Sequence, residues 1–485
     1  MRRLLVPLAA LFLAAPPLLA RQADPVLERI KEEGMERSQV MEVYGALTDA
    51  IGPRLTGSPA YHEAVYWVGE RLEGMGLSTE VDPFEFGRGW TLEGFTLEMT
   101  GPYYDPLTAH PEAWSPSTEG VLEGVPVYVG DLSAAEIRAM AGRLRGAIVL
   151  PFPPQPAFIT EDRPQPTEPD EPVDLGAPGF IRPQGQIPRN EVADLMREVG
   201  AGAYLRPDQG QHGTLFVLGS RNTPDDAAPS VVLSGEDYNR LVRMLQMEVP
   251  PRLRLEVRTR FHTDDTDAYN ILAEIPGTDP ALAGEVVMAG AHLDSWHSSV
   301  GATDNADGVA AVMEALRILQ AVGVRPRRTV RIALWSGEEQ GLLGSRAWVE
   351  EHQDELEDVA FYVNQDIGGG RTYGLYLQGN QEAAPVLDGW TRNLQDVGAR
   401  RNVAATIGSS DHVPFDQAGV PSFSTVQDYR DYDVRTHHTN ADAFERVREE
   451  DLRQSAVVLA GLLYQAAMAE RALPRKRPAS QQGGG

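Results

Sequence analysis

The sequence predicts an α/β protein in which a mixed, mostly parallel sheet is flanked by helices and interrupted by an inserted β-rich domain. From residue 268 onward, continuous apolar runs alternate with amphipathic stretches, as is typical of buried strands connected by helices. Residues 87–261 instead contain short strand-like runs separated by turn residues. The length of 485 residues is sufficient for more than one globular unit.

The N-terminal residues 1–20 predict a secretory signal peptide, because two arginines precede a short apolar run that ends in small residues and prolines. An uncleaved membrane anchor is the alternative, although the apolar run is short for a bilayer span. Residues 21–86 are predicted to be helical and to belong to the same domain as residues 262–472. We therefore expect an exported protein, periplasmic or secreted, that has no membrane attachment after cleavage.

Residues 87–261 are predicted to form a separate β-rich or α+β domain. Its strand-like runs are "GVPVYVG", "GAIVLPF", "GTLFVLG" and "PSVVLSG", and helical patterns cover residues 134–142 and 189–200. The proline-rich acidic segment 151–188 has too few apolar residues to contribute to a core, so we expect a long loop there.

Residues 262–472 predict the main sheet and its covering helices, followed by a disordered tail at residues 473–485. Helices are expected at residues 308–319 and 384–398, where apolar residues recur at helical spacing. The expected strands are residues 269–275, 285–291, 329–335, 359–365, 375–379 and 421–427.

Composition restricts the chemistry of any site. The chain has no cysteine, so a metal site has to be built from histidine, aspartate and glutamate. The net charge of -27 argues against nucleic acid as a partner, because binding to phosphates requires a basic surface.

Metal-binding side chains follow four of the predicted strands at the point where each strand ends. In an open α/β sheet such side chains gather beyond the carboxyl ends of the strands. They are His292 and Asp294 after residues 285–291, Glu338 and Glu339 after 329–335, Asp366 after 359–365, and His437 and His438 one loop after 421–427. Together with Asp304, at the start of the helix predicted at 308–319, they predict a metal centre.

The residue types suit a hydrolytic centre with two metal ions. Such a centre needs a carboxylate that bridges the ions, one or two further ligands for each ion, and a free carboxylate that carries a proton. Adjacent Glu338 and Glu339 suit a division in which one binds metal and the other remains free. Imidazole and carboxylate ligands favour zinc, with cobalt or manganese as alternatives.

Five motifs resemble the zinc exopeptidases of metallopeptidase family twenty-eight, and within it the carboxypeptidase Q (plasma glutamate carboxypeptidase) group. They are "GAHLDSWHSSVGATDNADG", "WSGEEQGLLGS", "NQDIGG", "SSDHVPFDQAGVPSF" and "THHTNAD". The segment "LTDAIGPRLTGS" extends the resemblance toward the N-terminus, and "RGAIVL" and "REVGAGAYLR" resemble parts of a protease-associated domain.

The resemblance implies two zinc ions and assigns their ligands. His292 and Asp366 would hold one ion, Glu339 and His438 the other, and Asp304 would bridge them. His438 is preferred to His437 because it stands four residues before Asp442.

Further roles follow from the same resemblance. Glu338 would be the general acid and base, and Asp294 would orient His292. We interpret His297 as part of a surface turn. The residues expected to contact substrate are Ser410, Asp411, His412 and Tyr432.

The expected function is hydrolysis of a peptide bond next to a free terminus, by an aminopeptidase, a dipeptidase or a carboxypeptidase Q-like enzyme. Aminoacylase-like exopeptidases use similar residues but place their extra domain after the paired glutamates, whereas here the insertion precedes His292. Two competing hypotheses are a glutaminyl cyclase-like transferase and a receptor-like relative without catalysis. We expect peptide substrates, and an insertion that limits access, recognises partners or contributes to a homodimer.

Overall fold

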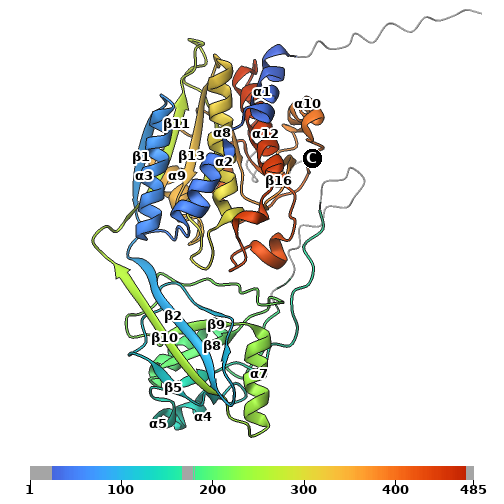
Figure 1. Ribbon diagram of the computed structural model, residues 1–485. Coiled ribbons are helices and arrows are strands. Elements are labelled where there is room, and N and C mark those ends of the chain that lie inside the picture. The colour runs from blue at the N-terminus through green and yellow to red at the C-terminus, as the bar shows by residue number, and fades with distance from the viewer. Residues whose placement is uncertain (1–23, 166–178, 180, 477–485) are drawn as a thin grey trace, which may run out of the picture.

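The computed structural model describes residues 24–165, 179 and 181–476 (Figure 1). The predicted signal peptide lies outside the described residues, as do positions 166–178 and 180 of the proline-rich loop. The described chain forms two parts, and the long strands β2 (Gly89–Gly101) and β10 (Arg252–His262) extend through the lower part of the view up to its boundary with the upper part.

The first part is built on a seven-stranded mixed sheet, with the strand order β1-β11-β13-β12-β14-β16-β15. Its four central strands, β13, β12, β14 and β16, are parallel to one another, while β1, β11 and β15 pair antiparallel. The bounds are β1 Ser78–Glu85, β11 Asp267–Ile275, β12 Val286–His292, β13 Thr329–Trp335, β14 Val359–Asn364, β15 Thr372–Tyr376 and β16 Ser422–Gln427. The α/β fold and its mostly parallel centre agree with the prediction.

Both faces of this sheet are covered, which explains why its strands are continuous apolar runs. In β12, Val287 and Ala289 join the large core on one face, while Val286 and Met288 join a second cluster on the other. The first core is completed by helices α1 (Pro25–Glu36), α2 (Val40–Gly45), α3 (Pro59–Gly74), α8 (Asp307–Val322) and α12 (Glu449–Met468). The second cluster is completed by α9 (Leu343–Glu351) and α11 (His412–Gln417).

Helix α8 runs through the large core of the first part. Its residues from Asp307 to Leu319 are all buried, and among them the charged Glu314 and Arg317 form an ion pair with each other. It ends at Gly323, which adopts a left-handed conformation with φ of 73° and donates its N–H to the carbonyl group of Gln320. At its other end it follows the turn Ala302–Ala306, in which Asp304 has non-helical backbone angles, with φ of -141° and ψ of 79°. Asp304 therefore lies in a kink immediately before α8.

The second part of the structure, which we call the insert, contains two smaller sheets formed from residues 89–262. One has the order β3-β2-β10-β5 and the other the order β4-β9-β8-β7-β6. A separate apolar cluster packs between these sheets and their helices. The remaining bounds are β3 Asp105–Pro106, β4 Ala109–Pro111, β5 Leu122–Gly124, β6 Val127–Tyr128, β7 Ile148–Leu150, β8 Ala203–Pro207, β9 Ser230–Leu233, α4 Ala134–Ala139, α5 Ala141–Leu144, α6 Arg189–Glu198 and α7 Gly235–Gln246.

The remaining elements are short or lie at the periphery. They are helix α10 Ala384–Arg392, the π-helical turns Ala46–Ile51 and Tyr432–Thr436, and the 3-10 turns Gln395–Val397 and Phe444–Arg446. No helix among the described residues is both long enough and apolar enough to pass through a bilayer.

Three predicted segments differ from the structure. Residues 78–85 were expected to be helical but form the edge strand β1, because α3 ends before Gly76, which has a φ of 78°. Residues 213–219 were expected to form a strand but join no sheet, and Phe216 forms an isolated antiparallel β-bridge with Thr439 instead. The tail is packed as far as residue 476: Leu473 is buried, and Arg475 donates to the carbonyl groups of Gly419, Leu356, Glu357 and Val359.

Candidate metal centre

The parallel strands bring the predicted ligands to one edge of the main sheet. His292 is the last residue of β12, and Asp366 follows the end of β14 by two residues. Glu338 and Glu339 follow the end of β13. His438 comes from the loop after β16, which crosses toward the same edge.

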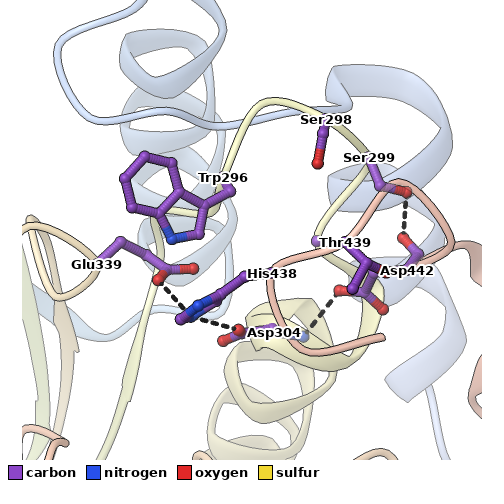
Figure 2. Close-up of a pocket in the computed structure, with 9 residues that line it drawn as sticks. Trp296, Ser298, Ser299, Asp304, Glu339, His438, Thr439 and Asp442 are labelled. Carbon is purple, nitrogen blue, oxygen red and sulfur yellow. Dashed lines mark hydrogen bonds and ion pairs between the residues drawn. The ribbon is translucent and has the colours of Figure 1, made fainter. Parts of the chain in front are cut away.

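The five predicted ligands form two groups that share Asp304. The Nε2 atom of His292 lies 3.0 Å from Asp366 Oδ1 and 3.2 Å from Asp304 Oδ1. The Nε2 atom of His438 lies 2.8 Å from Glu339 Oε2 and 3.3 Å from Asp304 Oδ2. Figure 2 shows the second group, with the imidazole of His438 between the two carboxylates. Asp304 therefore presents one oxygen to each histidine.

The hydrogen bonding of His292 fits a cation at this site. Its Nδ1 lies 3.0 Å from the carbonyl oxygen of Asp294, which can only accept, so Nδ1 carries a proton and Nε2 is the atom directed at the carboxylates of Asp304 and Asp366. Burial opposes a charge on His292, but the surrounding carboxylates raise the pKa of His292 well above its ordinary value, so positive charge is favoured between Nε2 and these oxygens.

The distances fit zinc as well. Tetrahedral zinc with bonds of 2.0–2.1 Å holds its ligand atoms about 3.3 Å apart. Three of the four separations above are 3.0–3.3 Å. Among the described residues, Asp304 Oδ2 and Glu339 Oε1 are buried without a hydrogen-bond partner, which leaves ligand capacity unused.

His437 lies beside the second group but is oriented differently. Its ring stacks on Tyr432, with centroids 4.7 Å apart and planes 22° from parallel. It could also reach an ion held with Asp304 and His438, because their ligand atoms lie within 4.8 Å of one another. Burial, with the nearby His438, lowers the pKa of His437 to about 3, so His437 is neutral at physiological pH.

The carboxylate of Asp294 supports the turn that carries both glutamates. It accepts the Thr56 hydroxyl at 2.9 Å and the backbone N–H groups of Glu338 and Glu339 at 3.3 and 3.4 Å. Its Oδ1 is 3.7 Å from Nδ1 of His292, farther than its own carbonyl oxygen. In this structure the main chain of Asp294 contacts His292, while its side chain holds the glutamate turn.

Arg54, to which the sequence assigned no role, holds the loop between His292 and Asp304. It is fully buried, and its guanidinium donates to the carbonyl groups of Leu47, Gly52, Leu293, Val300 and Gly301. Burial lowers the pKa of Arg54 to about 10, against the opposing charge of Asp442, so it remains a cation at neutral pH. The sequence contains the motif "GPRLTGS", but three of the five partners of Arg54, Leu293, Val300 and Gly301, lie 239 to 247 positions away.

Replacing Arg54 by methionine is expected to lower the free energy of unfolding by about 3 kcal/mol or more, because buried carbonyl groups lose their donors. Urea unfolding followed by circular dichroism measures this. The exposed Arg143→Met in the insert is the matched control and should be near neutral. Equal urea midpoints for the two variants would contradict this role of Arg54.

The four residues expected to contact substrate occupy different positions. The hydroxyl of Ser410 donates to Asp366 and accepts from Asn364 Nδ2 at 2.6 Å. Asp411 accepts from the Ser345 hydroxyl, and burial with neighbouring carboxylates raises its pKa to about 8. His412 is buried, and its Nε2 is 2.9 Å from Gln378 Nε2 and 3.1 Å from the carbonyl oxygen of Ile407.

Ser410, Asp411, His412 and the fourth expected residue, Tyr432, do not line the pocket beside the second ligand group. Its walls are Trp296, Ser298, Ser299, Gly301, Thr439 and Asp442, together with the ligands Asp304, Glu339 and His438 (Figure 2). Within the described chain, the indole N–H of Trp296 and the hydroxyl of Ser298 are buried without partners. A sequence search for charged side chains misses both residues.

His297 does not lie in a surface turn as interpreted. Its Nε2 lies 2.8 Å from the carbonyl oxygen of Pro111, and its ring packs edge-on against Trp90 and His110 at centroid distances of 5.0 and 4.9 Å. Burial and the nearby His110 lower its pKa to about 3. The residue joins the loop of His292 to the insert, and the aromatic partners that bury it are remote in sequence.

The comparisons with known proteins point to a metallopeptidase family. The sequence profile of peptidase family M28 matches residues 270–463, which hold all five predicted ligands and Glu338. This segment belongs to peptidase family M28.

Similarity to known peptidases extends beyond the matched segment. Human carboxypeptidase Q is 25% identical over 455 residues, covering 91% of this chain and 88% of the relative. The crystal structure of a peptidase M28 precursor from Shewanella amazonensis is 24% identical, with a TM-score of 0.71 over 93% of this chain and 98% of that chain. A zinc aminopeptidase from Bacillus subtilis is 21% identical, with a TM-score of 0.61 over 89% and 95% of the two chains. These two structures establish the shared fold.

Proposed function

We propose that the protein is an exported di-zinc exopeptidase that hydrolyses a peptide bond next to a free terminus of a short peptide. The observation that carries this proposal is the carboxylate of Asp304, which presents one oxygen to the His292 group and the other to the His438 group. A shared carboxylate of this kind is the feature that distinguishes a two-metal centre from a single site. Export is proposed from the signal-like residues 1–20.

The proposed ligands are His292 and Asp366 for one ion and Glu339 and His438 for the other, with Asp304 as the bridge. Two bound zinc ions would polarise the scissile carbonyl, acidify the attacking water and lower the pKa of Glu338. All five side chains are neutral imidazoles or carboxylates, so no thiol is needed.

Glu338 is proposed to take the proton from the attacking water and to deliver it to the leaving amine. It lies in the turn beside Glu339, and the carboxylate of Asp294 accepts both backbone N–H groups of this turn. Burial raises the pKa of Glu338 well above its ordinary value, and the charges of Asp366 and Asp411 add to this while His292 opposes it. Asp294 holds this turn through the turn's own backbone N–H groups. In the described chain the side chain of Glu338 is therefore not needed to hold the turn and is available for proton transfer.

Recognition of a free terminus is proposed to involve the wall formed by Trp296 and Ser298. Both residues have buried donors without partners beside Asp304 and Glu339. Carboxypeptidase Q and the zinc aminopeptidase, to which the chain is similar, bear names that refer to opposite termini of a peptide. The terminus of the peptide that the protein recognises therefore has to be determined by experiment.

The proposal is tested with unblocked dipeptides and with the same peptides acetylated at the amino end, amidated at the carboxyl end, or both. We expect zinc-dependent hydrolysis of the unblocked peptides that a chelator abolishes and added zinc restores. Loss of activity with one of the two single blocks identifies the terminus that is recognised. Equal cleavage of doubly blocked peptides would contradict exopeptidase action.

Two further readouts address the competing hypotheses. Release of a pyroglutamyl product from peptides with N-terminal glutamine would favour a cyclase. A purified protein that binds no zinc would favour a receptor-like relative without catalysis.

A further inference from the structure

The loop that carries His438 is conformationally demanding. We call residues 428–440 the histidine loop. Three of its residues that are not glycine, Arg430, Asp431 and His438, have positive φ values of 28°, 62° and 60°. Such conformations cost free energy in residues with a side chain and persist only where surrounding structure holds them. The surroundings of the loop therefore decide whether His438 stays in place.

One segment of the insert binds the middle of this loop through paired charges. The guanidinium of Arg163 forms a bidentate pair with Asp433, with Nε 2.8 Å from Oδ2 and Nη2 2.5 Å from Oδ1. The backbone N–H of Arg163 donates to the same carboxylate at 2.9 Å. The side chains are only 15% and 5% exposed, so this pair is better shielded from solvent than a surface ion pair.

The neighbouring Asp162 binds backbone groups at the start of the π-helical turn Tyr432–Thr436. Its carboxylate accepts the N–H of Asp431 at 2.6 Å and the N–H of Val434 at 3.1 Å. One of these donors belongs to a residue with positive φ. Asp162 and Arg163 therefore both stabilise the conformation of the loop, one through its backbone and the other through Asp433.

A second segment of the insert, residues 213–217, binds the end of the loop that contains the ligand. The N–H of Val217 donates to the carbonyl oxygen of His438 itself at 2.9 Å. Asn440 exchanges hydrogen bonds with Leu215, through its N–H at 3.1 Å and its side-chain oxygen at 2.8 Å, and its Nδ2 donates to the Gly213 carbonyl at 3.1 Å. The side chains of Ile159, Phe216 and Val434 form an apolar cluster between the two segments and the loop.

The main domain holds the start of the histidine loop. The N–H of Asp428 donates to the carbonyl group of Arg371, the Tyr429 and Tyr376 hydroxyls lie 2.6 Å apart, and Arg430 pairs with Asp451 at 2.8 Å. Farther along, His438 faces Asp304 and Glu339 through its Nε2 and Trp296 through its ring. In the portion of the chain that the structure describes, the other polar contacts of residues 431–440 are within the loop, with the adjoining residues 441–442, or with the insert. The other ligand group, by contrast, sits on the ends of β12 and β14 in the main sheet.

We propose that Asp162 and Arg163, together with residues 213–217, form a clamp that positions His438 and thereby sets the affinity of one of the two metal positions. This inference rests on the proposed di-zinc function. The affected position is the one formed by Asp304, Glu339 and His438. The position formed by His292, Asp304 and Asp366 has its ligands on the main sheet and the start of α8 and is independent of the clamp.

The test is a zinc and cobalt titration of the metal-free full-length protein and its Arg163→Met variant. We expect the unaltered protein to bind two equivalents. We expect the variant to bind the first with unchanged affinity and the second about 10- to 100-fold more weakly, the usual effect of losing a residue that supports a ligand. Backbone amide exchange in residues 428–440 should be faster in the variant, a change that does not depend on activity.

Two further variants sharpen the result. Arg163→Lys should give an intermediate loss, because lysine cannot form the bidentate pair with Asp433. Asn440→Ala removes the side-chain hydrogen bonds to Gly213 and Leu215, keeps the backbone hydrogen bond to Leu215, leaves the charge pair intact, and should weaken the same metal position. This variant keeps the test decisive if Arg163→Met does not fold.

The matched control is Arg138→Met. Arg138 forms an equally direct pair with Glu198 on the exposed surface of the insert, away from the loop, and its loss should leave both metal affinities unchanged. Folded Arg163→Met and Asn440→Ala proteins that bind two metals as tightly as the unaltered protein would overturn the clamp. An unaltered protein that binds fewer than two metals would instead contradict the proposed function, so the two failures are distinguishable.

Discussion

Replacing Glu338 by glutamine is expected to lower kcat by about 1,000-fold, while the protein still binds two zinc ions. Glutamine keeps the size and the hydrogen-bonding groups of the side chain but cannot carry the proton from water to the leaving amine. The backbone of the turn is held by Asp294, so the substitution should leave Glu339 in place. Steady-state kinetics with an unblocked dipeptide and metal analysis of the same preparation provide the two measurements.

The exposed Glu351→Gln in α9 is the matched control for this substitution and should retain full activity. A Glu338→Gln protein that keeps kcat within about tenfold of the unaltered enzyme would remove Glu338 from the proton path. A protein that loses zinc would instead make Glu338 a ligand and exchange its role with that of Glu339.

Replacing Asp304 by asparagine is expected to weaken metal binding at both positions and to abolish hydrolysis. Asparagine has one carbonyl oxygen and no charge, so it cannot present an anionic oxygen to each ligand group. The loss of affinity should exceed about 100-fold, the upper end of what the loss of a supporting residue costs. Zinc titration of the metal-free variant measures it, and the exposed Asp354→Asn is the control.

The stability of the metal-free Asp304→Asn protein separates this effect from misfolding. Asp304 lies among other buried carboxyl groups, and its negative charge contributes to raising the pKa values of Asp307, Asp366 and Asp442. Burial and these neighbours disfavour the charge, but His292 and His438 outweigh them and hold the pKa of Asp304 well below its ordinary value. The charge is therefore net stabilising, so the metal-free variant should unfold cooperatively but at a lower urea concentration than the metal-free unaltered protein at neutral pH. A variant that binds two zinc ions at full strength would exclude Asp304 as the bridge.

The main sheet could be predicted from the sequence because its signal is local. Strand β13 has the predicted bounds, Thr329–Trp335, since its residues are apolar on both faces and both faces are buried. The gathering of the proposed ligands could be predicted for a related reason, as the ends of parallel strands lie at a common edge, whereas their individual roles came from the family resemblance. The position of Glu338, Glu339 and Asp366 at this edge could be predicted from the rule alone, without knowledge of tertiary contacts.

The features that the sequence did not predict depend on partners remote in the chain. Residues 213–219 have the composition of a strand, but Leu215 and Val217 hydrogen-bond with residues 438–440 instead of joining a sheet. The interpretation of His297 as part of a surface turn missed its contacts with Trp90 and His110, because both of these residues come from the insert. Arg54 has no local signal that separates a buried cation from a solvated one.

The position of His438 late in the chain has a consequence for biosynthesis. A nascent polypeptide that has not yet reached this residue already contains both clamping segments, the glutamate turn and Asp304, but only one complete set of ligands. In the proposed two-metal centre, a chain that ends before this residue would hold at most one of the two ions. Synthesis past residue 438 therefore has to precede activity.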